Sequence, residues 1–149
     1  MKTTLSILLM LVLSALCAPA MGRLDALSEI ESRNNDLAIG SQHEVSRYQI
    51  LPVFWTQAWG QNKPRGTYRN PTNPAAARMV VNWIMQPRCR AFEARYRRAP
   101  DDFEFYILWH RPACYIGLLV PRRISAAEAD RGRRFAFLCQ TRMELASAQ

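Results

Sequence analysis

The segment from Leu24 to Trp55 constrains the fold more than any other part of the sequence. It begins as a short amphipathic helix in which Leu24, Leu27 and Glu31 share one face through their i, i+3, i+7 spacing. A carboxylate therefore lies in line with the apolar side chains that meet the core. A buried charge is costly unless it is paired or neutralised by a proton. This placement suits a general acid, although a helix-end Glu turned out to solvent would give the same pattern.

Helices are predicted along most of the remaining chain. Pro52 opens a short helix, and Asn73 is expected to cap a helix over 75–85. Pro87 is expected to break or kink that helix, with a separate helix over 88–98. Because strand-like alternation is rare, the sequence predicts a mainly α-helical protein.

Two more helices are predicted in the C-terminal half. Asp101 and Asp102 begin one of them, because acidic residues suit the first turn of a helix. Ser125 with Glu128 forms a capping-box pattern, which predicts a final helix over 126–145.

The N-terminus has the pattern of a secretory signal peptide. Lys2 is followed by an apolar run over residues 5–16 and by Ala18-Pro19-Ala20, a small-x-small cleavage site. We therefore predict a signal peptide over residues 1–20 and one mature domain over 21–149, exported to the periplasm or the extracellular space. An uncleaved anchor is the alternative, although the run is short for a membrane span. After cleavage we expect no membrane span.

Charge and cysteine content narrow the classes of partner and site. The 149 residues carry a formal net charge of +8, which favours anionic partners such as cell-wall polymers, lipid headgroups or nucleic acid. Three cysteines follow the predicted signal peptide, and we favour a disulfide between Cys114 and Cys139 over one with Cys89. With two histidines and no Cys-x-x-Cys, the sequence predicts no metal site, and we expect no cofactor.

The sequence after the first helix resembles the soluble lytic transglycosylase family and its lysozyme-like relatives. Three short segments carry the likeness: Glu31-Ser32, Ala38-Ile39-Gly40, and Tyr48-Gln49-Ile50 with Pro52. In that family a catalytic Glu-Ser is followed, at a similar interval, by the Gln of a Gly-Leu-Met-Gln segment. Here Gln49 follows Glu31 by 18 positions, and Ser46-Arg47-Tyr48 replaces Gly-Leu-Met. The resemblance implies a compact, lysozyme-like helical domain with long loops.

The resemblance extends to a segment near residue 110. The family has Ala-Tyr-Asn-Ala-Gly there, lining the sugar groove, where this chain has Leu108-Trp109-His110-Arg111-Pro112. An aromatic residue is retained as Trp109, whereas His110 replaces the Asn. His110 would therefore donate to a sugar hydroxyl or serve a structural role.

A peptidoglycan substrate follows from the resemblance, with cleavage at the β-1,4 bond between N-acetylmuramic acid and N-acetylglucosamine. Glu31 would protonate the leaving oxygen and then accept the proton of the muramoyl C6 hydroxyl, giving a 1,6-anhydro product. A second carboxylate, for which Glu44 is the candidate, would instead favour hydrolysis. Glu44 as an exposed loop residue is the alternative. The residues expected to bind the glycan strand are Ser32, Tyr48, Gln49, Trp109 and His110. We expect a monomer.

Two other functions remain open. A lysozyme-like module that holds glycan strands without cutting them would explain the departures at Ser46-Arg47 and at His110-Arg111-Pro112. A cationic protein that binds nucleic acid or membrane is the other. We expect no nucleic-acid partner, because the arginines are spread over several helices. The sequence contains no G-x-G-x-x-G, P-loop or G-x-S-x-G motif.

Overall fold

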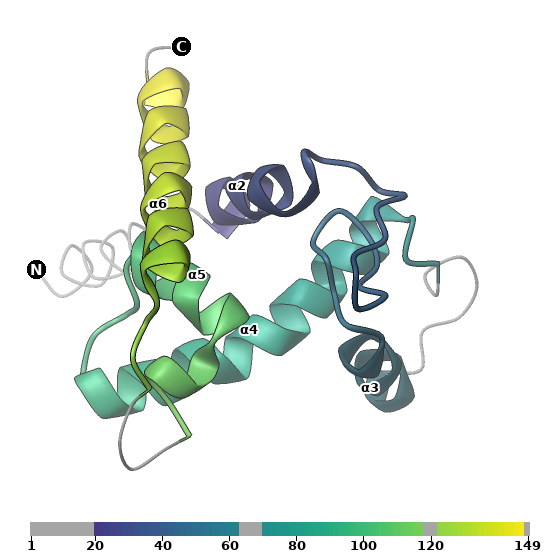
Figure 1. Cartoon of the computed structure of the whole chain (residues 1–149), viewed down its shortest axis with the longest axis horizontal. Coiled ribbons are helices and arrows are strands. Elements are labelled where there is room, and N and C mark those ends of the chain that lie inside the picture. The colour runs from purple at the N-terminus through teal and green to yellow at the C-terminus, as the bar shows by residue number, and fades with distance from the viewer. Residues whose placement is uncertain (1–19, 63–69, 118–121, 148–149) are drawn as a thin grey trace, which may run out of the picture.

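The computed structural model describes residues 20–62, 70–117 and 122–147, and this part of the chain is mainly helical, with no strand (Figure 1). The predicted signal peptide lies outside these ranges, apart from Ala20. No helix in the described ranges is long and apolar enough to cross a membrane. The elements, in chain order, are α2 (Ala20–Ser32), α3 (Pro52–Asn62), α4 (Pro74–Tyr96), α5 (Asp102–His110), the 3-10 turn η2 (Pro112–Cys114) and α6 (Ala126–Ser147).

The predicted helix starts are confirmed by their capping contacts. The Asn73 side chain accepts hydrogen bonds from the backbone N–H groups of Ala75 (2.9 Å) and Ala76 (3.2 Å). Asp101 and Glu104 form a reciprocal capping box at the start of α5, and Ser125 and Glu128 form another at the start of α6. Each cap satisfies backbone donors that the first turn of a helix leaves unpaired.

The prediction of two helices on either side of Pro87 is wrong, because α4 is a single helix that contains this proline. Proline removes one backbone hydrogen bond and is unfavourable inside a helix. Apolar side chains are buried both before and after it, including Ile84, Met85 and Phe92. Burial on both sides of Pro87 offsets the lost hydrogen bond.

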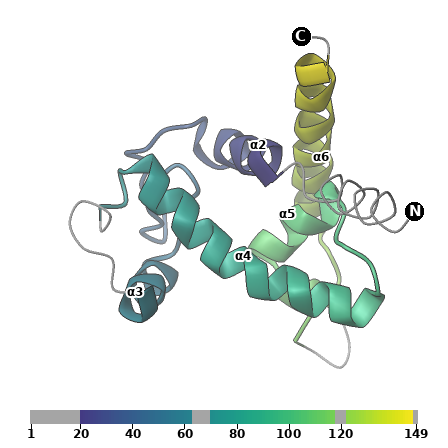
Figure 2. The same cartoon turned by 180° about the vertical axis from the view of Figure 1, so that it is seen from behind.

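The long helix α4 spans the molecule and organises the packing. α3 packs against it on one side of the view, and α5 packs against it on the other (Figures 1 and 2). α6 packs on both α5 and α2. The largest fully buried side chains of the resulting core come from several elements: Leu27, Tyr48, Ile50, Val80, Val81, Phe92, Tyr106, Ile107, Leu108 and Phe135.

The helices α2 and α5 are joined at both ends. At the first end, Arg23 Nε donates to Asp102 Oδ1 (2.6 Å), and Arg23 Nη2 donates to the Pro100 carbonyl (3.0 Å). At the second end, Glu31 meets His110. Because the starts of the two helices are joined to each other and so are their ends, α2 and α5 run in the same direction.

The favoured disulfide between Cys114 and Cys139 is not formed. The Cys114 thiol instead lies 3.9 Å from the Arg123 carbonyl, to which it donates. The sequence spacing of cysteines carries no information on the distance between their side chains, which is what decides a pairing.

Candidate functional site

The candidate site is centred on Glu31, close to the C-terminal end of α2. Leu24 and Leu27, on the same helix face, are buried, and the Glu31 side chain is only 6% exposed. The alternative of a carboxylate turned out to solvent is therefore wrong. Glu31 Oε1 lies 2.7 Å from Nε2 of His110, the last residue of α5. The buried carboxylate predicted from the apolar stripe is thus paired, and its partner is 79 positions away in the sequence.

The proton in this contact has two available positions. An Nε2–H of His110 donates to an ionised Glu31, or a protonated Glu31 donates to the unprotonated Nε2. The contact lies where the C-terminal ends of α2 and α5 meet. The site therefore combines a buried carboxyl with a histidine that can donate to it or accept from it.

Tyr106 and Arg131 complete this cluster, and the sequence analysis missed both. Tyr106 lies one turn before His110 on α5, with ring centroids 4.8 Å apart. Burial raises the pKa of Tyr106, the nearby Glu31 carboxylate raises it further, and Arg131 of α6 opposes the rise. The Tyr106 hydroxyl is buried and makes no hydrogen bond of normal geometry to the described residues. It is a donor held beside Glu31.

The chain reverses direction immediately after Glu31-Ser32. Arg33 and Asn34 adopt positive φ angles of 55° and 62°, and their backbone N–H groups bond to carbonyls of the last turns of α2, at Glu29 and Ser28. This left-handed ending is a common way to stop a helix. It leaves Glu31 at the point where the 33–51 loop begins.

Ser32 fastens that loop to the helix. Its hydroxyl donates to the Arg47 carbonyl (2.9 Å) and accepts from the Asn35 N–H (3.0 Å). The Arg47 guanidinium makes two bonds to Asp36, of 2.6 and 2.7 Å, and this contact raises the pKa of Arg47. Ser32, which we expected to bind substrate, is therefore engaged within the protein, where it holds the Gln49 segment beside the Glu31 end of α2.

The Gln49 segment is a tight turn. Val45 and Ile50 exchange backbone hydrogen bonds of 2.9 Å across it. Ser46, where the resembled family has Gly, adopts φ 70° and is buried. Such a φ favours glycine, and Gln49 follows with φ 51°. The turn thus has the backbone that a glycine would adopt, although its sequence lacks one.

Gly40 sits beneath the side chains of Glu44 and Gln49. A Cβ at this position would overlap the Glu44 carboxylate and lie 2.5 Å from Gln49 Oε1. Glu44 Oε2 accepts the Gln42 N–H (2.8 Å), and Gln49 Nε2 donates to the Ser46 carbonyl (3.1 Å). Glu44, the candidate second carboxylate, is thus folded onto its own loop, which gives it a structural role there.

Tyr48 is not placed as we expected. It is 1% exposed and packs in the core, so its ring presents no face on which a sugar could stack. Burial raises its pKa, which Arg78 and Arg47 oppose. The sequence around Tyr48 does not show whether its ring is exposed or buried. The turn geometry at Ser46 directs this ring inward.

Trp109 is half-buried against the core, and the backbone around it is held by a half-buried arginine. Arg88 Nη1 donates to the carbonyls of Leu108 (2.8 Å) and Trp109 (2.7 Å), the last carbonyls of α5 before His110. A cation at a helix C-terminus is favourable. Arg88 thereby fixes the backbone that presents His110 to Glu31.

No group of His, Cys, Asp and Glu in the described part of the chain has an arrangement that could hold a metal ion. Comparison of the whole chain with family models, with curated proteins and with solved structures found no match.

Proposed function

We propose that this protein cleaves the glycan strands of peptidoglycan as a lytic transglycosylase, with Glu31 as its single general acid and base. The observation that carries this proposal is the buried Glu31 carboxyl, 2.7 Å from His110. The next residue, Ser32, bonds to the Arg47 carbonyl of the turn that holds Gln49. The resemblance to the family rests on Glu31-Ser32, on Gly40 and on Gln49. All of them fall at one end of α2 or in the loop fastened to it.

The chemistry requires a carboxyl that first gives and then takes a proton. Protonated Glu31 donates to the glycosidic oxygen as the bond to C1 breaks, and N-acetylglucosamine leaves with that proton. The Glu31 carboxylate then accepts the proton of the muramoyl C6 hydroxyl as its oxygen bonds to C1, which closes the 1,6-anhydro ring. Glu31 ends protonated, as it began, and no water is consumed.

The surroundings of Glu31 match these two steps. His110 and Tyr106 are donors close to the carboxylate that forms in between. A general acid or base of this kind accounts for about 10²- to 10⁴-fold in rate. The engagement of Glu44 within its own loop favours the one-carboxylate route over hydrolysis.

A non-catalytic glycan-binding module is the second candidate. It is favoured by the His110 contact itself, because a Glu31 oxygen that is held by histidine must be released before it can reach a glycosidic bond. Cleavage and binding are separable by experiment.

The test is a zymogram in which a gel loaded with peptidoglycan is cleared by active protein. We expect clearing by the wild type and none by Glu31→Gln, which keeps the shape of the side chain but cannot transfer the proton. Glu29→Gln, on the same helix, is the matched control and should clear like the wild type. Equal clearing by Glu31→Gln would remove Glu31 from the mechanism. No clearing by the wild type, with retention on insoluble peptidoglycan, would favour the binding module.

A further inference from the structure

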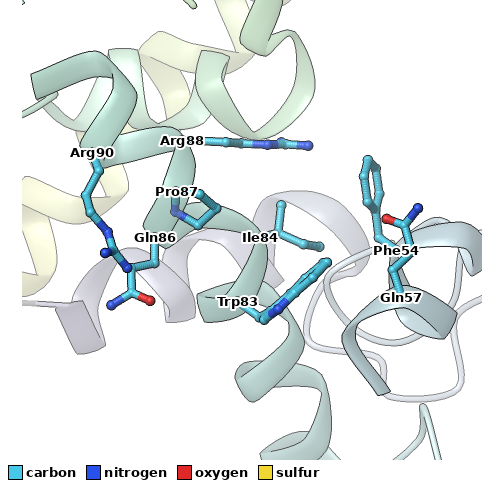
Figure 3. A pocket seen from close by; sticks show the side chains of 8 residues that line it. All are labelled: Phe54, Gln57, Trp83, Ile84, Gln86, Pro87, Arg88 and Arg90. Carbon is cyan, nitrogen blue, oxygen red and sulfur yellow. The ribbon is translucent and has the colours of Figure 1, made fainter. Parts of the chain in front are cut away.

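A pocket of about 420 Å³ lies between α3 and α4, and neither Glu31 nor His110 lines it. Its volume is toward the lower end of the range for small-ligand sites. Half of the residues that line it are apolar: Phe54 comes from α3, and Trp83, Ile84 and Pro87 come from α4. Figure 3 shows the Arg88 side chain crossing the top of the pocket toward Phe54, with Trp83 below it. The pocket therefore combines aromatic surface from two helices with a cation at its top.

Arg88 carries a positive charge that the described part of the protein does not neutralise. No carboxylate in that part forms an ion pair with it. Its Nη1 donates to the carbonyls of Leu108 and Trp109, which leaves Nε and Nη2, the edge of a guanidinium that binds a carboxylate through two parallel bonds. Burial lowers the pKa of Arg88 to about 10, so its surroundings disfavour the bare cation. An anionic ligand would offset this cost.

The second arginine of the pocket, Arg90, does not share a binding point with Arg88. Its side chain lies with Gln86 on the side away from Phe54, whereas Arg88 reaches toward Phe54 (Figure 3). Arg90 is also exposed, so water solvates its charge. The pocket therefore suits a ligand with a single anionic group, bound at Arg88.

The walls near Arg88 favour a flat apolar group in the rest of the ligand. Phe54 and Trp83 provide aromatic rings, and contacts between rings are stabilised beyond the area that they bury. The Arg88 guanidinium lies 5.4 Å from the centre of the Phe54 ring, so an anion bound at Arg88 has an aromatic side chain beside it. A sugar ring fits poorly, because its hydroxyls need many polar partners and the uncharged polar side chains of the lining are only Gln57 and Gln86.

We propose that this pocket binds an aromatic monocarboxylate, with Arg88 as the partner of the carboxylate and with Phe54 and Trp83 against the ring. This binding does not depend on the cleavage of glycan strands, because neither Glu31 nor His110 lines the pocket. One charge-assisted contact and the ring contacts hold the ligand, so both its charge and its ring contribute to the affinity.

An NMR titration of the whole, isotope-labelled protein tests the proposal with three probes. Phenylpropanoate has the ring and the charge, phenylpropanamide has the ring without the charge, and acetate has the charge without the ring. The indole N–H peak that disappears in Trp83→Phe identifies Trp83. We expect phenylpropanoate to shift this peak and to bind about tenfold more tightly than the amide, the value of one charge-assisted contact. Acetate should leave the peak in place at the same concentrations.

Three variants locate the contact within the pocket. Arg88→Gln removes the proposed partner of the carboxylate, and the acid and the amide should then bind equally, to within about twofold. Arg90→Gln is the matched control, because it removes the same charge from the other side of the pocket and should keep the tenfold ratio. Phe54→Leu removes one ring, so it should weaken the acid and the amide alike by about threefold.

Equal affinity of the wild type for the acid and the amide, or a Trp83 peak that the acid does not move, would overturn the proposal. So would an equal loss of the ratio in Arg88→Gln and Arg90→Gln, because the acid would then respond only to the general positive charge. A shift of the Trp83 peak by acetate as large as that by phenylpropanoate would leave the ring without a role. If Arg88→Gln does not fold, Phe54→Leu keeps the test valid, because unchanged affinity in that variant would place the acid outside the pocket.

Discussion

The two ends of the α2–α5 pair are joined in chemically different ways. At the first end, Arg23 binds Asp102, and both side chains keep about a quarter of their surface exposed. Arginine is always charged, and an aspartate in the first turn of a helix is favoured by its dipole. At the second end, Glu31 is 6% exposed, and its partner is His110, whose charge depends on its protonation.

The difference separates a structural contact from a candidate for chemistry. Both contacts span 79 positions and are 2.6–2.7 Å long, so neither sequence separation nor distance distinguishes them. Burial and the identity of the partner do, because a histidine can hold or release a proton whereas an arginine stays charged. We infer that the Arg23–Asp102 contact stabilises the fold and that the reaction takes place at the Glu31–His110 contact.

The largest expected effect comes from removing the histidine at the second end. His110→Ala leaves the Glu31 carboxylate buried without its partner, and we expect the free energy of unfolding at pH 7 to fall by about 3 kcal/mol. Urea denaturation measures it. Adding Glu31→Gln to His110→Ala should recover part of the loss, because the buried charge is removed. A full loss that persists in the double variant would show that His110 acts only through packing.

A smaller effect is expected from the loop fastened to the same end. Gly40→Ala forces the Glu44 and Gln49 side chains to move, and we expect about 2 kcal/mol of destabilisation and a roughly 100-fold fall in glycan cleavage. Gly60→Ala is the control, because a Cβ there meets no atom within 4 Å. It lies within α3 and should stabilise the protein by about 0.5 kcal/mol. Unchanged cleavage in Gly40→Ala would remove the loop from the site.

A substitution at the first end of the helix pair should lower the stability slightly and leave glycan cleavage unchanged. Arg23→Gln removes the ion pair with Asp102, and we expect about 1 kcal/mol of destabilisation with cleavage unchanged when the folded protein is assayed. Thermal unfolding and the rate of turbidity loss of a peptidoglycan suspension give the two readings. A fall in cleavage as large as that of Gly40→Ala would contradict the division between the two ends.

The smallest effect concerns acid stability near His110. Hydrogen bonds from the Ser125 backbone and hydroxyl and from Arg111 lower the pKa of Glu128 to about 2. A lowered carboxyl pKa stabilises the fold above its unfolded value near 4.5, and this contribution is lost as the pH falls toward 2. Glu128→Gln should therefore flatten the dependence of unfolding on pH between about 4.5 and 2. An unchanged slope in this interval would show that the contact is not maintained in solution.

Local signals in the sequence predicted the helices better than they predicted the site. Asn73 and Ser125 act on backbone groups within three residues, so their capping roles were visible without a fold. The acidic residues at 101 and 102 likewise predicted a helix start, although not that Asp101 is the N-cap. Leu24 and Leu27 on the same face made the burial of Glu31 one of two open possibilities, and the contact with His110 decides between them. Continuity across Pro87 was not visible, because it depends on packing against other elements.

The side chains around Glu31 could be predicted only in part. His110 was singled out through a resemblance, but the contact with Glu31 depends on α2 and α5 running in the same direction. Tyr106 and Arg131 carried no signal, because their proximity to Glu31 arises only in the packed structure. The inward turn of Tyr48 depends on the left-handed Ser46. The spacing of four residues between Tyr106 and His110 would put them on one helix face, but it says nothing about their distance from Glu31.

We propose that the Glu31–His110 end of the helix pair cleaves glycan strands, and mass spectrometry of the sugars released from purified sacculi tests this most directly. Wild-type protein should release muropeptides with 1,6-anhydro ends, and folded Glu31→Gln should release none. Reducing ends from the wild type would instead assign hydrolysis. Equal release by both proteins, or release by neither, would contradict the account.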